Sequence, residues 1–197
     1  MGQLRVSQIR RKVKNHLDRE RYEHTLGVMY TAGAMAMCYN VELEQAMLAG
    51  LLHDCAKCIP DTKKIVLCDK YHLNVSEAES DNHSLLHAKL GAFLTAKKYH
   101  IYDKEIINAI ASHTTGRPEM TMLDKVIYIA DYIEPGRSEI PELSEIRKLA
   151  FEDINECLYR IVKNSLSYLE TMDLTIDPMT EKTYIYYKCK LNKHELK

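Results

Sequence analysis

Met47-Leu48-Ala49-Gly50-Leu51-Leu52-His53-Asp54 places an imidazole and a carboxylate directly after a run of apolar and small residues. At the edge of a core, such groups cost free energy unless they are paired or coordinate a metal. A bound cation is the simplest explanation for both groups together. We therefore expect a metalloenzyme whose metal site lies in the core, between helices.

Four other segments carry a metal-ligand residue on an apolar helix face. The periodic sets are Ile106, Ile110 and His113; Leu123, Ile127 and Asp131; His24, Val28 and Met35; and His87, Leu90 and Leu94. Spacings of three and four residues put each set on one side of a helix. The sequence thus predicts that several helices point polar ligands inward.

A single buried histidine in a helical protein is usually just hydrogen-bonded, and this chain has nine histidines. Polar neighbours favour solvation or local pairing for the following four: His16, His72, His100 and His194. The remaining candidates follow the order H, HD, H, H, D along the chain, as His24, His53-Asp54, His87, His113 and Asp131. This order resembles the HD superfamily.

Three stretches resemble the YqeK family of HD-domain proteins more narrowly, over roughly residues 5–170. They are Arg21-Tyr22-Glu23-His24-Thr25-Leu26, Leu48-Ala49-Gly50-Leu51-Leu52-His53-Asp54-Cys55-Ala56-Lys57, and the run containing His113-Thr114-Thr115-Gly116-Arg117 and Ala130-Asp131-Tyr132-Ile133-Glu134-Pro135-Gly136-Arg137. The resemblance implies a symmetrical diadenosine tetraphosphate hydrolase that binds iron and releases two ADP.

We expect two groups of ligands. The tighter ion is assigned to His24, His53, Asp54 and Asp131, whereas His87 and His113 face the phosphates or hold a second ion. Nitrogen and oxygen ligands without thiolate suit iron, manganese or a related divalent ion. The ion would lower the pKa of a bound water toward about 7, and this water would attack phosphorus.

Asp54 is predicted to orient or deprotonate that water. Lys57, His113 or Arg137 would stabilise the leaving nucleoside diphosphate, and the sequence does not choose among them. The expected substrate-binding residues are His24, Asp54, His87, His113, Thr114, Thr115, Gly116, Arg117, Tyr132 and Arg137; the resemblance alone places the last six near the nucleotide.

Composition limits the partners. The chain has 197 residues, 27 basic against 28 acidic side chains, and no global field to recruit nucleic acid. No apolar run reaches the length of about 18 residues needed to cross a membrane, and no signal core follows the start. We expect a cytoplasmic protein that binds a small nucleotide, with neither a nucleic-acid nor a membrane partner; a homodimer is left open.

The six cysteines are expected to be reduced thiols, because the chain has no secretion signal and enough apolar residues for a core. The Cys55-Ala56-Lys57-Cys58 spacing has no second pair to complete a zinc site. We therefore interpret Cys55 and Cys58 as ordinary cysteines without a metal or redox role.

Periodic segments predict an all-α fold: a single HD-domain helical bundle over residues 1–197, with a core of about 5–170 and a C-terminal extension at 171–197. The expected helices are 5–20, 22–39, 42–55, 61–72, 84–99, 103–114, 121–133 and 142–171. Predicted caps are Asn40, Asp103 and a Thr121/Asp124 capping box. The tyrosine-rich stretch 183–188 is β-prone but has no partner strand, so a terminal helix or disordered tail is favoured.

Three alternatives remain. An HD phosphohydrolase acting on a nucleoside triphosphate or monophosphate would use the same metal site. A cyclic-dinucleotide phosphodiesterase of the HD-GYP type is disfavoured, since no Gly-Tyr-Pro triplet occurs. A non-catalytic nucleotide-binding regulator is disfavoured because all six ligand candidates are present.

Overall fold

The computed structural model describes residues 2–195, with side chains over residues 5–192. Its helices are α1 (Gly2–Lys14), α2 (Arg19–Tyr39), α3 (Leu43–Leu52), α4 (Asp61–Lys70), α5 (Glu77–Asp81), the short 3-10 helix η1 (His83–Leu85), α6 (Leu86–Tyr99), α7 (Lys104–Ser112), α8 (Met122–Ile133), α9 (Leu143–Glu152), α10 (Ile154–Thr171) and α11 (Pro178–Glu195). No residue in this part of the chain forms a strand, so the all-α prediction is confirmed.

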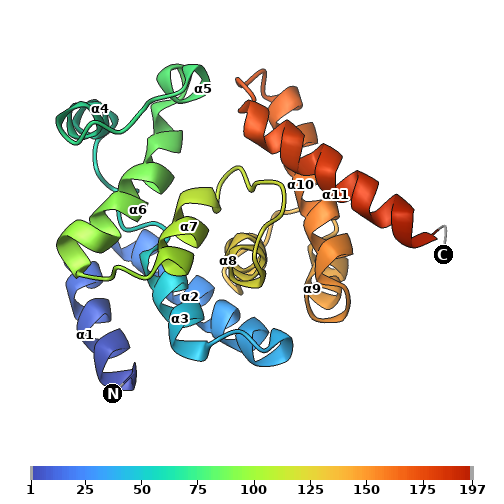
Figure 1. The fold of residues 1–197 in the computed structure, drawn as a ribbon, viewed down its shortest axis with the longest axis horizontal. Helices are drawn as coiled ribbons and strands as arrows, with labels where there is room; N and C mark the ends of the chain where they lie inside the picture. Colours follow the sequence, from blue (N-terminus) through green and yellow to red (C-terminus); the bar gives the residue numbers. More distant parts are fainter. Residues whose placement is uncertain (1, 196–197) are drawn as a thin grey trace.

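Helix α8 lies at the centre of the bundle (Figure 1). Every residue from Leu123 to Ala130 is buried, and α8 packs against α2, α3, α7 and α10. Helices α2 and α3 also pack on each other, and α6 packs on α7. This arrangement brings the inner faces of five segments, α2, α3, α6, α7 and α8, around one point.

Helices α9, α10 and α11 lie on the other side of α8 (Figure 1). The Lys125 ammonium donates to Asn155 Oδ1 at 2.8 Å and so links α8 to α10. Tyr187 of α11 is completely buried and belongs to the same hydrophobic cluster as Ile127 of α8. The tyrosine-rich end is therefore a docked helix, the first of the two forms expected for it.

Local signals explain most helix boundaries. Asp103 accepts from Glu105 N at 2.9 Å, and Thr121 and Asp124 form the expected capping box. The cap predicted at Asn40 is wrong. Asn40 ends α2 in the left-handed region at φ 54°, and Glu42 instead caps α3, as its Oε2 accepts from Gln45 N at 2.7 Å.

Two other predictions of helices are corrected, and one capping box was missed. The expected helix 142–171 is two helices, because Asp153 is extended and its side chain caps α10. The first break falls at residues 15–18 rather than at 21, since Asp18 accepts from Arg21 N at 2.8 Å and caps α2. The capping box that starts α5, formed by Ser76 and Glu79, was not predicted.

The division into a core of residues 5–170 and an extension over 171–197 stays a prediction.

All six cysteines are free. Four histidines were expected to be solvated or locally paired. Three of them are exposed: His16, His72 and His100. The side chain of the fourth, His194, lies outside the described residues.

Candidate metal centre

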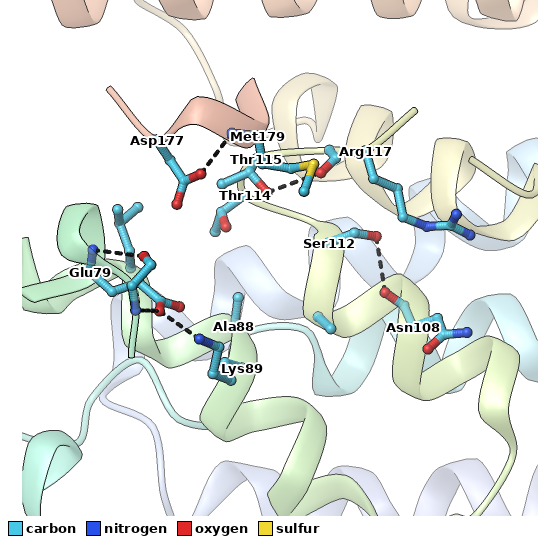
Figure 2. Close-up of a pocket in the computed structure, with 14 residues that line it drawn as sticks. Glu79, Ala88, Lys89, Asn108, Ser112, Thr114, Thr115, Arg117, Asp177 and Met179 are labelled. Carbon is cyan, nitrogen blue, oxygen red and sulfur yellow. Dashed lines mark hydrogen bonds and ion pairs between the residues drawn. The ribbon is translucent and has the colours of Figure 1, made fainter. Parts of the chain in front are cut away.

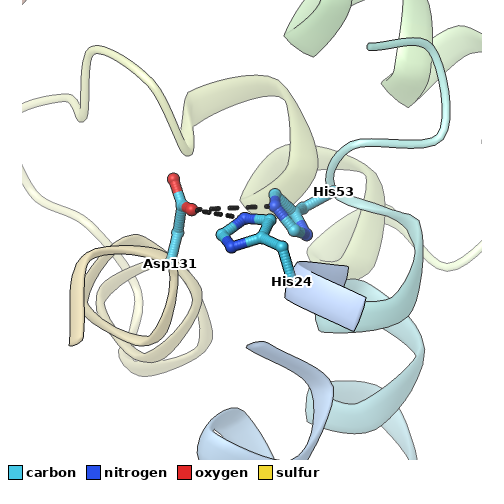
Figure 3. Close-up of side chains that lie close together, drawn as sticks. All are labelled: His24, His53 and Asp131. Carbon is cyan, nitrogen blue, oxygen red and sulfur yellow. Dashed lines mark ion pairs between the residues drawn. The ribbon is translucent and has the colours of Figure 1, made fainter. Parts of the chain in front are cut away.

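The six predicted ligand residues come together from five segments. His24 lies in α2, His53 ends α3 and is followed by Asp54, His87 lies in the first turn of α6, His113 ends α7, and Asp131 lies in α8. Figure 3 shows His24, His53 and Asp131 pointing toward one another. The prediction that separate helices converge on one site is thus realised in the geometry.

Each of the four imidazoles has its Nδ1 atom paired with an acceptor, and three of these acceptors are backbone carbonyls three residues earlier. Because a carbonyl oxygen only accepts, Nδ1 carries the proton and Nε2 keeps a lone pair. The pairs are His53 with Gly50 O at 2.7 Å, His113 with Ile110 O at 2.7 Å, His87 with Ser84 O, and His24 with Glu134 Oε1 at 3.2 Å.

The first group of donor atoms gathers around Asp131. His24 Nε2 lies 3.0 Å and His53 Nε2 3.8 Å from Asp131 Oδ1. Oδ2 of Asp54 completes the group, at 3.4 Å from His53 Nε2 and 3.9 Å from His24 Nε2. Two nitrogen and two oxygen donors therefore face a common point.

The second group shares the Asp54 carboxylate through its other oxygen. Asp54 Oδ1 lies 3.1 Å from His87 Nε2 and 3.6 Å from His113 Nε2. The two Nε2 atoms of these histidines are themselves 3.1 Å apart. Asp54 thus lies between two clusters of donors, one on each carboxylate oxygen.

These donors fit a cation. His24 Nε2, His53 Nε2 and Asp54 Oδ1 are buried and have no hydrogen-bond partner among the described residues. Lone pairs and carboxylate oxygens at these distances repel each other unless a positive charge lies among them. In protein metal sites, a ligating histidine usually donates its other ring N–H to a carboxylate or a backbone carbonyl, as all four imidazoles do here.

The pKa values of Asp54, His53 and His87 reflect burial and the close approach of these groups to one another. Burial opposes the charge on Asp54, but His53 and the other imidazoles hold the pKa of that carboxyl well below its usual range. Burial disfavours protonation of His53, yet Asp54 raises its pKa overall. Burial lowers the pKa of His87 to about 4, which keeps this imidazole neutral and able to coordinate.

Two arginines border the carboxylates. Arg21 Nη1 lies 2.9 Å from Asp54 Oδ2, and Arg137 Nη2 lies 2.9 Å from Asp131 Oδ1. Arg137 was predicted near phosphate, whereas Arg21 was not assigned a role. Its position three residues before His24, on the same face of α2, is the signal that would have identified it. The same spacing relates Asp131 of α8 to Glu134, the residue that follows this helix.

A cavity of about 660 Å³ opens beside the first group of donors. His24 lines it together with three arginines and three glutamates: Arg19, Arg21, Arg137, Glu20, Glu23 and Glu134. Guanidinium groups bind phosphate oxygens in a bidentate geometry. This cavity therefore places guanidinium groups beside the candidate metal ligand His24.

The segment Thr114–Arg117 lines a different cavity of about 600 Å³, between α5, α6, α7 and the start of α11. Figure 2 shows Thr114 and Asp177 at this cavity, with the Arg117 side chain on the far side from Glu79 and Lys89. Of the predicted substrate-binding residues, His24 and Arg137 therefore line the first cavity and Thr114–Arg117 the second. The following four line neither: Asp54, His87, His113 and Tyr132.

Three predicted residues have other surroundings. Arg117 pairs with Asp124 of the α8 capping box, whose side chain is completely buried. Tyr132 lines neither cavity, and burial raises the pKa of its hydroxyl. Lys57 is half-buried, and burial lowers its pKa while Asp54 opposes that shift.

A family model described as HD domain matches residues 21–136, which span all six donor residues. A helical bundle with inward histidines and aspartates in this order agrees with that match. The chain belongs to the HD domain family.

Its relatives define the branch of this family. The chain is 40% identical over 174 residues to the symmetrical bis(5'-nucleosyl)-tetraphosphatase of Bacillus subtilis (strain 168), covering 87% of this chain and 91% of that one. It is 34% identical over 186 residues to the protein of the same description from Staphylococcus aureus (strain NCTC 8325 / PS 47), covering 93% and 95%. The chain is therefore a member of the YqeK family of symmetrical bis(5'-nucleosyl)-tetraphosphatases.

The fold has a solved counterpart. A crystal structure from Clostridium acetobutylicum, described as a predicted HD superfamily hydrolase involved in NAD metabolism, superposes with a TM-score of 0.89 at 40% identity. The match covers 93% of this chain and 97% of that one. It extends beyond residues 21–136, so the helices outside the HD match are shared as well.

Proposed function

We propose that this protein is a metal-dependent hydrolase that cleaves diadenosine tetraphosphate symmetrically into two ADP. The observation that supports the metal chemistry is the convergence of four imidazole Nε2 atoms on the carboxylates of Asp54 and Asp131. The relatives supply the substrate, because they are described as symmetrical bis(5'-nucleosyl)-tetraphosphatases.

The residues suited to hold the tighter ion are His24, His53, Asp54 and Asp131, with His87 and His113 facing a second ion or the phosphates. A divalent cation in such a site lowers the pKa of a coordinated water and neutralises phosphate charge. We propose iron because the resemblance to the YqeK family implies it. The nitrogen and oxygen donors suit iron, and they would also suit manganese or another divalent ion.

The chain's own side chains then do the remaining work. Arg21 and Arg137 would hold phosphate oxygens at the cavity beside His24. Asp54 would orient the attacking water or accept its proton. Lys57, His113 or Arg137 would stabilise the ADP that leaves as the phosphoanhydride bond breaks. Thr114, Thr115, Gly116, Arg117 and Tyr132 stay assigned near the nucleotide as part of this proposal.

A second candidate is hydrolysis of another nucleotide, which is suggested by the Clostridium structure, because that protein is described as a hydrolase involved in NAD metabolism. The test uses the purified, iron-loaded protein with diadenosine tetraphosphate, ATP, AMP and NAD, each with and without a chelator. We expect metal-dependent turnover with diadenosine tetraphosphate as the preferred substrate. Binding without turnover of any of the four would favour a regulator and contradict the proposal.

The location and assembly follow as separate proposals. No helix among the described residues is long and apolar enough to cross a membrane. We propose a cytoplasmic protein, given six free cysteines and a nucleotide substrate. We also propose a homodimer, which sedimentation velocity would distinguish from a monomer of 22.8 kDa.

A further inference from the structure

Glu134 lies directly behind the metal ligand His24. Its Oε1 atom is 3.2 Å from His24 Nδ1, and its Oε2 atom accepts from Gly136 N at 2.6 Å. The residue is only 4% exposed. The other three imidazoles use backbone carbonyls at this position, so His24 alone among them has a carboxylate as its Nδ1 partner.

Two glycines leave the space that this carboxylate occupies. A Cβ atom at Gly27 of α2 would lie 2.3 Å from Glu134 Oε2, and one at Gly136 would lie 2.9 Å from Oε1. A side chain at either position would displace the carboxylate. The contact between Glu134 and His24 therefore depends on small residues from two separate segments.

Arg147 of α9 fixes the turn that carries Glu134. Its guanidinium donates to three backbone carbonyls, at 2.9 Å to Ile133 O, 2.8 Å to Glu134 O and 3.1 Å to Arg137 O. Helix α9 lies outside the residues that match the HD domain model. A helix beyond the HD match thus holds the second layer of the metal centre in place.

We propose that Glu134 is a positioning residue for His24, an inference that rests on the proposed metal site. By accepting the Nδ1 proton, the carboxylate fixes the orientation of the ring and keeps the Nε2 lone pair directed at Asp131 and Asp54. A carboxylate partner also makes the imidazole a stronger donor than a carbonyl partner does. His24 thereby becomes the strongest nitrogen ligand of the first group.

The competing structural role is that of a cap, in which Glu134 serves only Gly136 and the nearby Arg137, whose Nε lies 4.0 Å from Oε1. A cap would change the stability of the metal-free protein but not its intrinsic affinity for metal. Metal affinity, measured on folded protein, therefore separates the two roles.

The test is the Kd for Mn²⁺ of wild type, Glu134→Ala and Glu134→Gln, measured by calorimetry with chelator competition. Loss of such a partner weakens metal binding about 10- to 100-fold, and we expect this for the alanine variant. We expect a smaller loss for glutamine, because its single amide oxygen cannot serve both His24 and Gly136. Glu79→Gln is the control, since Glu79 is also buried but pairs with Lys89 away from the ligands.

Gly27→Ala is an independent test, because this variant retains Glu134 but its added methyl group would push the Glu134 carboxylate away from His24. We expect weaker Mn²⁺ binding for this variant too. If Glu134→Ala does not fold, the glutamine and Gly27→Ala variants decide the matter. Unchanged affinity in the folded variants would overturn the positioning role. Failure of wild type itself to bind Mn²⁺ or Fe²⁺ would instead overturn the proposed metal site, and this inference with it.

Discussion

Arg21 Nη1 lies 2.9 Å from Oδ2 of Asp54, the carboxylate that faces both groups of histidines. The arginine side chain is 29% exposed and the carboxylate 4%. The guanidinium therefore connects the buried donors with the open cavity of about 660 Å³. A cation in that position can neutralise Asp54 when the protein is empty and contact phosphate when substrate is present.

We predict that Arg21→Ala lowers kcat/KM for diadenosine tetraphosphate by about 10- to 100-fold, the equivalent of one charge-assisted hydrogen bond of roughly 1.5–3 kcal/mol. Bound metal, measured by elemental analysis, should remain. Arg21→Lys should recover only part of the loss, because an ammonium lacks the bidentate geometry. Loss of metal together with activity would show that Arg21 acts on the ligands instead.

Asp131→Ala should remove both metal and turnover, since Asp131 Oδ1 faces His24 and His53. Saturating Mn²⁺ should stabilise wild type by about 2.7 kcal/mol at 100 times Kd, and this gain should vanish in the variant. Thermal unfolding with and without metal measures both. Asp69→Ala, on the exposed face of α4, should keep the full gain; normal turnover by Asp131→Ala would refute the ligand assignment.

Arg117→Ala should destabilise the protein by about 1–3 kcal/mol, because it leaves the buried Asp124 carboxylate without its charged partner. Urea unfolding of this variant, of Asp124→Asn and of the double variant gives the coupling between them. We expect the two losses to be clearly non-additive. Additive losses would mean that the pair does not stabilise the start of α8.

Gly116→Ala should cost about 1–3 kcal/mol of unfolding free energy, since Gly116 has φ +64°. Its added Cβ would also lie 2.7 Å from Thr183 Cγ2 of α11. The control is Gly33→Ala inside α2, where the nearest atom would be 3.4 Å away and alanine favours the helix. Equal effects of the two substitutions on urea unfolding would contradict the strain expected at Gly116.

The sequence allowed prediction of the helices and of the inward convergence of the histidine and aspartate side chains, because both depend on local patterns. His113 and Asp131 lie at helical spacing from buried apolar residues, so their inward direction follows from periodicity. Asp153 was missed as a break, because its cap interrupts a segment whose periodicity continues on both sides. Hydrophobic periodicity alone does not reveal a single residue at which one helix ends and the next begins.

The second layer of the site could not be predicted in the same way. Glu134 is 110 residues from His24 along the chain, and only the packing of α8 against α2 brings them together. Arg147 acts through backbone carbonyls, which carry no sequence signal. Contacts of this kind depend on tertiary packing, whereas ligand types and helix faces are local.

The most direct test of the proposed reaction is the identity of its products. The iron-loaded protein is incubated with diadenosine tetraphosphate in ¹⁸O-labelled water, and the nucleotides are separated by anion exchange and analysed by mass spectrometry. We predict ADP as the only nucleotide product, with the label on the terminal phosphate of one ADP for each bond broken. Release of AMP together with ATP would contradict symmetrical cleavage.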